Sequence, residues 1–365
     1  MSDTVFILGA GASKDAGCPL MGDFLDTARY LLAAGRVDDV REHFERVFRA
    51  IGNLQAVHSK SKLDLTNIES VFACFEIART IDKFPGMPAV DFDELIRSLK
   101  VLIARTIEST LTFHVLHQNA RIPGNYEKLA NLISKLRSDS IPPHSVSIIT
   151  FNYDLACDYA LFAKKIPFRY EIGDGPETND TEPVSLLKLH GSLNWTCGKT
   201  GVLRACRLWD CFAPYHTWHF DSDYVDVTQH LKMDPYFDRL FSDAPEQGFE
   251  PVIVPPTWNK GEYHKSVASV WSAAARELSD ARNIIVIGYS LPPSDVFFHH
   301  LYALGTVGDH PLQRFWVFDT DSSGEIERRY RDLLGPGALS PVFANNLCGF
   351  KDAIPLLESA LLDHV

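Results

Sequence analysis

The residues best suited to chemistry are a histidine, an asparagine and an aspartate that directly follow apolar runs. His190 comes after Ser185–Leu189, and Asn152 and Asp154 come after Ser145–Thr150. Histidine titrates near neutral pH, so His190 has the chemistry of a general base. The Asn152 amide can orient water or a hydroxyl without adding charge, and Asp154 can accept hydrogen bonds from an amide. Structural explanations stay open: His190 as a buried turn residue, and Asn152 and Asp154 as Asx-turn residues.

A glycine turn near the amino terminus is the second candidate feature. It follows the apolar run Thr4–Leu8 and consists of Gly9, Ala10, Gly11, Ala12 and Ser13. Small residues where a strand enters a helix allow backbone N–H groups to face a phosphate, although a plain tight turn explains the glycines as well. The full dehydrogenase pattern needs glycine at position 14, which is Lys14. The sequence therefore disfavours a hydride-transfer enzyme.

Short apolar runs separated by helical patterns must position these residues. Such runs, rich in Val, Ile and Leu without alternation, indicate strands that are buried on both faces. We therefore predict an α/β fold with a Rossmann-like parallel sheet and helices on both faces, and ligands at the carboxyl edge of the sheet. The predicted strands are Thr4–Leu8, Ser145–Thr150, Ser185–Leu189, Ile284–Ile287 and Phe315–Phe318, with Pro251–Pro255 as a shorter candidate.

A large helical insertion is expected directly after the first strand and helix. Apolar residues recur there at three- and four-residue spacing, with no convincing strand between them. The segments are Val37–Ile51, Asn67–Ile81, Phe92–His117 and Tyr126–Leu136. We accordingly expect a core of residues 1–22 and 139–365, carrying an irregular insertion at 196–250, and a helical subdomain at 23–138.

Composition excludes several classes of function. The formal net charge of −12 disfavours direct binding of nucleic acid. No apolar run is long enough for a membrane span and no signal peptide is recognisable, so we expect a cytoplasmic protein. The seven cysteines include no C-x-x-C pair, so we expect reduced thiols and no metal.

Four short segments, in order, resemble the motifs of the sirtuin superfamily. They are Gly9-Ala-Gly-Ala-Ser13, Thr150-Phe-Asn-Tyr-Asp154, Leu189-His-Gly-Ser192 and Gly288-Tyr-Ser-Leu291. The resemblance implies that NAD is a substrate and that the glycine turn cradles its pyrophosphate. It implies that Asn152 and Asp154 lie at the nicotinamide ribose and carboxamide and that His190 is the general base. It also implies that Gly288 and Ser290 lie against the adenosine-side ribose and phosphate, with Asp319 near the adenosine end, although Ser290 is equally suited to cap the next helix.

The chain departs from the protein deacylases of that superfamily. It lacks their paired zinc cysteines, and Phe151 stands where they carry glutamine before the asparagine. It is more similar to sirtuin-like domains of bacterial anti-phage defence systems, and Asn67-Ile-Glu69 and Pro255–Lys260 also look like features of that branch. This resemblance implies hydrolysis of NAD to nicotinamide and ADP-ribose, linear or cyclic. Such an enzyme needs gating, by homo-oligomer formation or by a partner such as a HerA-like ATPase or an Argonaute-type protein.

Two other functions stay open. One is an NAD-dependent protein deacylase or ADP-ribosyltransferase, which needs an acceptor before it releases nicotinamide. The other is a non-catalytic module that senses NAD or ADP-ribose.

Overall fold

The structure, a computed structural model, covers most of the chain. It describes residues 3–55, 62–87, 91–116, 119–138, 143–172, 182–197, 202–206, 208, 224–226, 251–254, 261–308 and 310–362. Most of the expected irregular insertion at 196–250, and the segment Pro255–Lys260, therefore lie outside the described residues.

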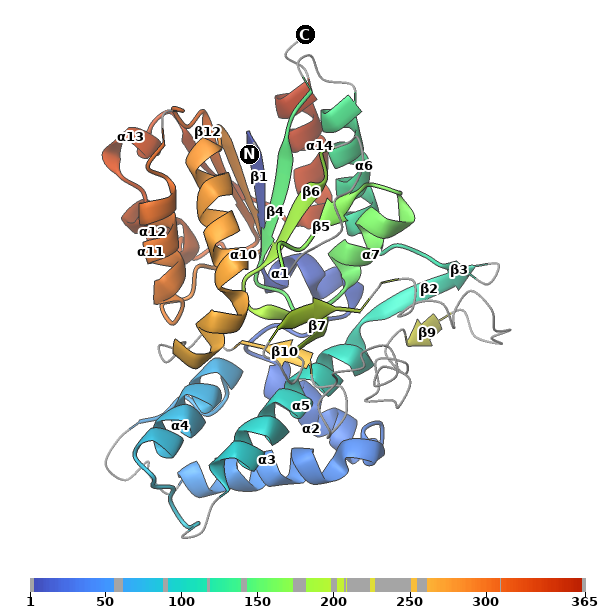
Figure 1. The fold of residues 1–365 in the computed structure, drawn as a ribbon, viewed down its shortest axis with the longest axis vertical. Helices are drawn as coiled ribbons and strands as arrows, with labels where there is room; N and C mark the ends of the chain where they lie inside the picture. Colours follow the sequence, from blue (N-terminus) through green and yellow to red (C-terminus); the bar gives the residue numbers. More distant parts are fainter. Residues whose placement is uncertain are drawn as a thin grey trace.

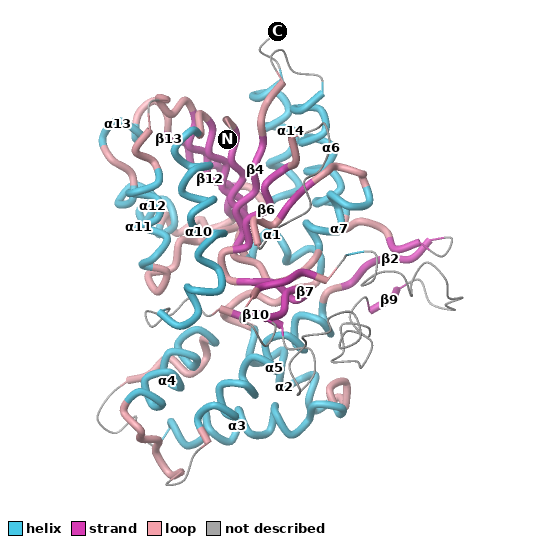
Figure 2. The backbone as a smooth tube through the Cα atoms, viewed as in Figure 1, coloured by secondary structure: helices cyan, strands magenta, loops and turns pink. Residues whose placement is uncertain are grey.

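A parallel sheet forms the centre of the molecule (Figures 1 and 2). Within the described residues it has seven strands in the order β13-β12-β11-β1-β4-β6-β5, and every neighbouring pair is parallel. The strands are β1 (Thr4–Leu8), β4 (Val146–Thr150), β5 (Phe168–Arg169), β6 (Val184–Lys188), β11 (Asn283–Ile287), β12 (Arg314–Asp319) and β13 (Phe343–Leu347). The predicted α/β class and parallel sheet are confirmed.

Both faces of this sheet are buried. Alternate residues of β1 enter two separate hydrophobic cores: Phe6 and Leu8 pack into one, and Val5 and Ile7 into the other. All four side chains are fully buried, and burial of one such side chain contributes about 1.5–3 kcal/mol to the free energy of unfolding. This two-sided burial explains why the strand sequence is continuously apolar instead of alternating.

Helices cover the two faces (Figure 1). On one face lie α6 (Gly124–Ser138), α7 (Ala156–Ala163) and α14 (Phe350–Leu362), whose buried residues belong to the core of Phe6. On the other face lie α10 (Gly261–Asp280), α11 (Val296–Gly305), α12 (Glu325–Leu333) and the short α13 (Pro336–Leu339). Apolar residues of these helices pack in the core that contains Val5. The predicted coverage of both faces is confirmed.

A group of helices lies beyond the carboxyl ends of the strands, in the lower half of Figure 1. Its members are α2 (Phe24–Ala33), α3 (Arg41–Leu54), α4 (Ile68–Thr80) and α5 (Phe92–Thr110). Helix α5 packs against the other three. The Asn67 side chain caps α4 by accepting a hydrogen bond of 2.8 Å from the Glu69 backbone N–H, which fixes the first turn of that helix.

The expectation of one unbroken helix over Phe92–His117 is wrong. Helix α5 ends at Thr110, and β2 (Thr112–Leu116) follows, paired antiparallel with β3 (Asn119–Ala120) and β9 (Tyr224–Asp226). The β2 sequence Thr-Phe-His-Val-Leu is rich in residues that favour strands, although its apolar spacing continues the helical pattern. Helix α6 packs on α14 and α7, on the face of the large sheet. The division of the chain into core and helical subdomain stays a prediction.

A small antiparallel sheet lies between the large sheet and the helical group. It consists of β10 (Pro251–Ile253), β7 (Gly191–Cys197) and β8 (Leu203–Ala205). The strand predicted at Pro251–Pro255 therefore exists, but in this second sheet. No helix among the described residues is long and apolar enough to cross a membrane.

Candidate active site

The carboxyl ends of the central strands meet at one edge of the sheet. Leu8 is in register with Ile287 of β11 and with Thr150 of β4, and Thr150 with Lys188 of β6. The residues that follow these strands therefore gather at the same edge. The chain runs from β1 to β4 and β6 on one side and to β11, β12 and β13 on the other. This reversal around β1 is the position at which open α/β sheets bind ligands.

Two glycine turns pack backbone to backbone at this edge. The Gly9 N–H donates to the Ile287 carbonyl (3.1 Å), and the Gly11 N–H donates to the Gly288 carbonyl (2.9 Å). A Cβ atom on Gly9 would lie 2.5 Å from the Gly288 oxygen. Gly288 has φ +62°, and a Cβ there would lie 2.5 Å from the Ala12 nitrogen. Only glycine fits such contacts, so these positions are fixed by the protein's own packing.

Hydrogen bonds within the protein occupy part of the predicted phosphate turn. The Gly9 and Gly11 amides donate to the β11 end, and the Ala12 N–H donates to the Gly9 carbonyl (3.0 Å). These three N–H groups are thus satisfied without a ligand. Ala10 and Gly11 line the cleft described below, whereas Gly9 and Ala12 are buried and do not line it.

Asn152 is held against the glycine turn by its side-chain amide. Its Nδ2 donates to the Gly9 carbonyl at 2.8 Å and to the Ser13 hydroxyl at 3.0 Å. Because a carbonyl can only accept, the nitrogen of the amide must face Gly9. The oxygen Oδ1 then points away from the Gly9 carbonyl, and Asn152 lines the cleft described below.

Ser13 lies at the centre of a buried polar network. Its hydroxyl donates to Asp154 Oδ2 at 2.6 Å, because a carboxylate can only accept. Because the Ser13 hydroxyl has one proton and donates it to Asp154, it accepts hydrogen bonds from the Tyr126 hydroxyl at 2.7 Å and from the Asn152 amide. The other Asp154 oxygen accepts from the Ala156 N–H at 2.9 Å, which is the expected Asx-turn. Asp154 therefore positions the turn as well as lining the site.

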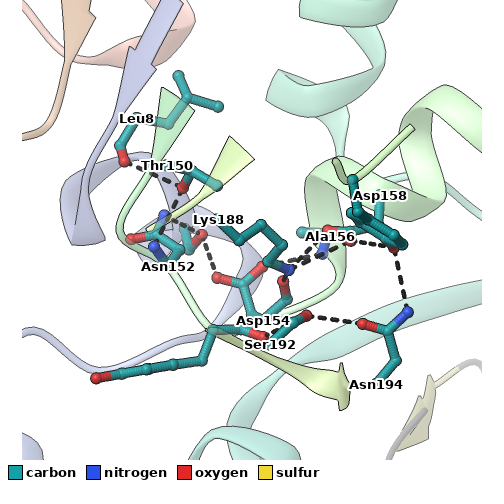
Figure 3. Close-up of polar contacts among 12 residues, drawn as sticks. Leu8, Thr150, Asn152, Asp154, Ala156, Asp158, Lys188, Ser192 and Asn194 are labelled. Carbon is teal, nitrogen blue, oxygen red and sulfur yellow. Dashed lines mark hydrogen bonds and ion pairs between the residues drawn. The ribbon is translucent and has the colours of Figure 1, made fainter. Parts of the chain in front are cut away.

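A buried ion pair between Lys188 and Asp158 contacts this network through the backbone of Asp154. Lys188 is fully buried and donates to the Asp154 carbonyl at 2.6 Å and to the Asp158 carboxylate at 3.0 Å (Figure 3). Burial raises the pKa of the Asp154 carboxyl, while the charge of Lys188 and the Ser13 hydroxyl act in the opposite direction. Lys188 received no role from the sequence, because a lysine at the end of an apolar strand gives no sign that it is buried.

His190 lies between aromatic rings and a carboxylate. Its ring centroid is 5.2 Å from that of Phe151 and 6.2 Å from that of Tyr153. Its Nε2 is 3.9 Å from Asp295 Oδ2, which accepts a hydrogen bond of 2.7 Å from the Tyr289 hydroxyl. The residue is only 5% exposed, so its imidazole faces a confined space beside the Asp295 carboxylate.

The turn that carries His190 is rigid. Gly191 has φ +87°, and a Cβ there would lie 2.0 Å from the Val252 carbonyl oxygen of β10. The His190 carbonyl accepts from the Val254 N–H at 2.8 Å. The small antiparallel sheet thus fixes the backbone on which the imidazole is mounted.

One cleft of about 540 Å³ brings most of the predicted residues together. Ala10, Gly11, Asn152, His190, Gly288, Ser290 and Asp319 all line it. A second, smaller cavity of about 50 Å³, which we call the inner cavity, adjoins it and is lined by Ala10, Ser13, Asn152 and Asp154 together with apolar residues of α4 and α5. A cleft of several hundred Å³ in which polar side chains stand among apolar walls is typical of sites for small ligands.

The far end of the cleft carries Ser290 and Asp319. Ser290 does not cap α11, whose N-cap residue is Asp295. Its carbonyl accepts from Arg329 at 3.0 Å. Asp319 ends β12 and accepts from the Asp321 N–H at 3.0 Å, and partial burial raises the pKa of its carboxyl.

Several residues at the cleft had received no role from the sequence. Phe151 stacks on Tyr289 with ring centroids 4.0 Å apart, and Asp295 lies beside His190. Glu69, noted only as part of a short segment, lines both cavities from α4. Only the fold could assign Glu69, because α4 is far from the sheet in sequence. Among the described residues, no group of three or more His, Cys, Asp or Glu side chains could hold a metal ion.

Comparisons with known proteins give only distant similarities. No protein-family model matches the chain, and no curated protein matches it. Among solved structures, a Sir2 homologue in complex with NAD is 13% identical, covering 99% of this chain and 91% of its own, with a TM-score of 0.41. A Sir2 complex with a p53 peptide and NAD⁺ is 12% identical, covering 98% and 92%, with a TM-score of 0.40. A mutant Sir2 homologue with ADP-ribose is 14% identical, covering 99% and 94%, with a TM-score of 0.39.

Proposed function

We propose that this chain binds NAD in the cleft and hydrolyses its nicotinamide–ribose bond. The observation that carries the proposal is the meeting of Asn152 and His190 in one cleft, beside the two glycine turns at the reversal point of the sheet. The cleft has the size expected for a dinucleotide site. The inner cavity, at roughly 10–15 Å³ per water molecule, has room for a few waters and suits a small planar ring.

The nicotinamide ring enters the inner cavity in this proposal, and the rest of the dinucleotide occupies the cleft. The inner cavity is mostly apolar, with Phe72, Ile103 and Ile107 among its walls. Such walls suit a ring that leaves as a neutral molecule. Asp154 and the backbone around Asn152 supply the polar groups for its carboxamide.

The reaction balances with residues already at the site. The C–N bond breaks, its electron pair neutralises the pyridinium nitrogen, and a water oxygen bonds to the ribose carbon. His190 accepts the proton that this water loses, and the nearby Asp295 carboxylate stabilises the resulting imidazolium. The Asn152 Oδ1, fixed in orientation by the glycine turn, holds the water or a ribose hydroxyl. Holding both reactants in place supplies much of the rate enhancement.

At the adenosine end, we assign Gly288, Ser290 and Asp319 to contacts with the ribose and phosphate. The lysine at position 14 also lines the cleft and offers its ammonium group to the pyrophosphate. This contact takes the place of the Gly9, Gly11 and Ala12 amides, which the protein itself satisfies.

The measurement that tests the proposal is nicotinamide release over time from purified protein and NAD, with and without an acetylated peptide. Release without peptide, lost in Asn152→Ala and His190→Ala but retained in His300→Ala, supports hydrolysis. His300 is exposed on α11 and serves as the matched control. Release that requires the peptide identifies a transferase or deacylase. Binding of NAD with no release, at any protein concentration or with any candidate partner, identifies a sensing module.

We further propose that the activity depletes NAD in the cytoplasm as the effector of an anti-phage defence system. Self-assembly or a partner such as a HerA-like ATPase or an Argonaute-type protein then gates it. Cells that express the wild-type protein with its genomic neighbours should lose NAD on phage infection, and cells with His190→Ala should not. Unchanged NAD in infected wild-type cells contradicts this role.

A further inference from the structure

The two cavities share five lining residues, and one of them is ionisable. The shared residues are Ala10, Met21, Glu69, Phe151 and Asn152. Glu69 is therefore the charged group at the junction between the cleft and the inner cavity. It is 8% exposed, so its carboxylate lies within the wall of the site and not in open solvent.

The position of Glu69 is fixed from two sides of the cleft. Its backbone is held in the capped first turn of α4 by Asn67. Its Oε2 accepts a hydrogen bond of 2.5 Å from the hydroxyl of Ser294, in the loop after β11. This length is typical of a hydroxyl that donates to a carboxylate. The helical group and the sheet edge thus hold the carboxylate between them.

The negative charge of Glu69 acts on two tyrosines near His190. Burial raises the pKa of Tyr153 and Tyr289, and the charge of Glu69 adds to the rise in both. Among the described residues that line the two cavities, Lys14 is the one lysine or arginine, and it belongs to the cleft only. The junction is accordingly an electronegative point.

We propose that Glu69 is a catalytic residue that stabilises the positive charge of the reacting NAD, first on the pyridinium ring and then on the ribose. This inference rests on the proposed function. If the ring occupies the inner cavity and the ribose the cleft, the bond that breaks lies at the junction. The charge moves from the ring nitrogen to the ribose as that bond breaks. A fixed carboxylate at the junction stays near the charge throughout. It favours binding of the cationic ring, and it lowers the barrier to the extent that its attraction strengthens as the charge moves onto the ribose.

A binding experiment tests this charge recognition without turnover. The two probes are carbocyclic NAD⁺, whose bond does not hydrolyse and whose ring is cationic, and NADH, whose ring is neutral. The wild-type protein should bind the cationic probe about 10-fold more tightly or better, equivalent to about 1.4 kcal/mol. Glu69→Gln should bring the two dissociation constants to within about 2-fold of each other. Glu69→Asp, which keeps the charge, should retain most of the preference.

Two controls separate charge from structure. Ser294→Ala removes the hydrogen bond but leaves the carboxylate, so the preference for the cationic probe should persist. Glu45→Gln removes an exposed carboxylate on α3 and should change neither dissociation constant. Equal wild-type affinity for both probes, or a preference that survives in Glu69→Gln, overturns the role of Glu69 while leaving the dinucleotide site intact. Failure of the wild-type protein to bind either probe overturns the proposed function and this inference together.

Discussion

The side-chain nitrogen of Asn152 lies 2.8 Å from the carbonyl oxygen of Gly9, although 143 residues separate them in the chain. The contact joins the ends of β4 and β1, which are neighbours in the sheet. It also fixes the direction of the Asn152 carbonyl oxygen, because the nitrogen is already committed. The predicted reactive group and the predicted phosphate turn are therefore one structural unit.

The Ser13 hydroxyl should contribute more to the free energy of unfolding than an exposed hydroxyl does. Ser13→Ala leaves Asp154 Oδ2 and the Tyr126 hydroxyl without their shared partner inside the protein. We expect a loss of about 1–3 kcal/mol in the free energy of unfolding, measured by urea titration. Ser134→Ala, at an exposed position on α6, should change it by less than about 0.5 kcal/mol. Equal effects of the two substitutions would contradict the network.

Two glycines should respond to alanine in opposite directions. Gly9→Ala puts a methyl group 2.5 Å from the Gly288 oxygen and should cost about 1–3 kcal/mol. Gly52 lies within helix α3, and a Cβ there meets no atom within 4 Å. Gly52→Ala should therefore raise the free energy of unfolding by about 0.5–1 kcal/mol. Thermal and urea unfolding measure both, and tolerance of Gly9→Ala would refute the close contact between the turns.

The contributions of Lys188 and Asp158 to the free energy of unfolding should depend strongly on each other. Lys188→Met leaves the fully buried Asp158 charge uncompensated and should cost about 3–5 kcal/mol. Asp158→Leu in the same protein removes that charge, so the double variant should be more stable than Lys188→Met alone. A double-mutant cycle in urea provides the coupling free energy. Additive losses would mean that the two charges do not depend on each other.

Asp319 should make stability fall as pH rises. Partial burial raises the pKa of its carboxyl in the folded protein, so the folded state binds this proton more tightly than the unfolded state. The contribution is fully present below the unfolded value near 3.8 and is lost as pH rises through the higher folded value. The stability of the wild-type protein relative to Asp319→Asn should therefore decline from about pH 4 to pH 7. Urea titrations across that range check the sign, and a relative stability that rises with pH would contradict it.

The sequence predicted the central strands because each is buried on both faces and is therefore continuously apolar. Thr4–Leu8 is predicted with the bounds of β1, and the other central strands differ by a residue or so at their ends. Strand β13 escaped prediction because Asn345 and Asn346 interrupt its apolar pattern, as an edge strand allows. Strand β2 escaped because its residues continue the spacing of the helix before it.

The candidate site was predictable where residues follow strands, and not elsewhere. Asn152 and His190 were identifiable because a parallel sheet brings the ends of its strands to one edge. Nothing in the sequence relates Glu69 to that edge, because the packing of α4 over it is a tertiary contact. Asp295 was equally hidden, since its role depends on Tyr289 and His190 together.

Residues of α4 and α5 form part of the wall of the inner cavity, although neither helix covers a face of the central sheet. An excised sheet with its flanking helices would keep Asn152 and His190 but open this recess to bulk water. The complete candidate site therefore cannot be cut from the chain by discarding α4 and α5. A grafting experiment that aims to transplant the chemistry must carry those helices with it.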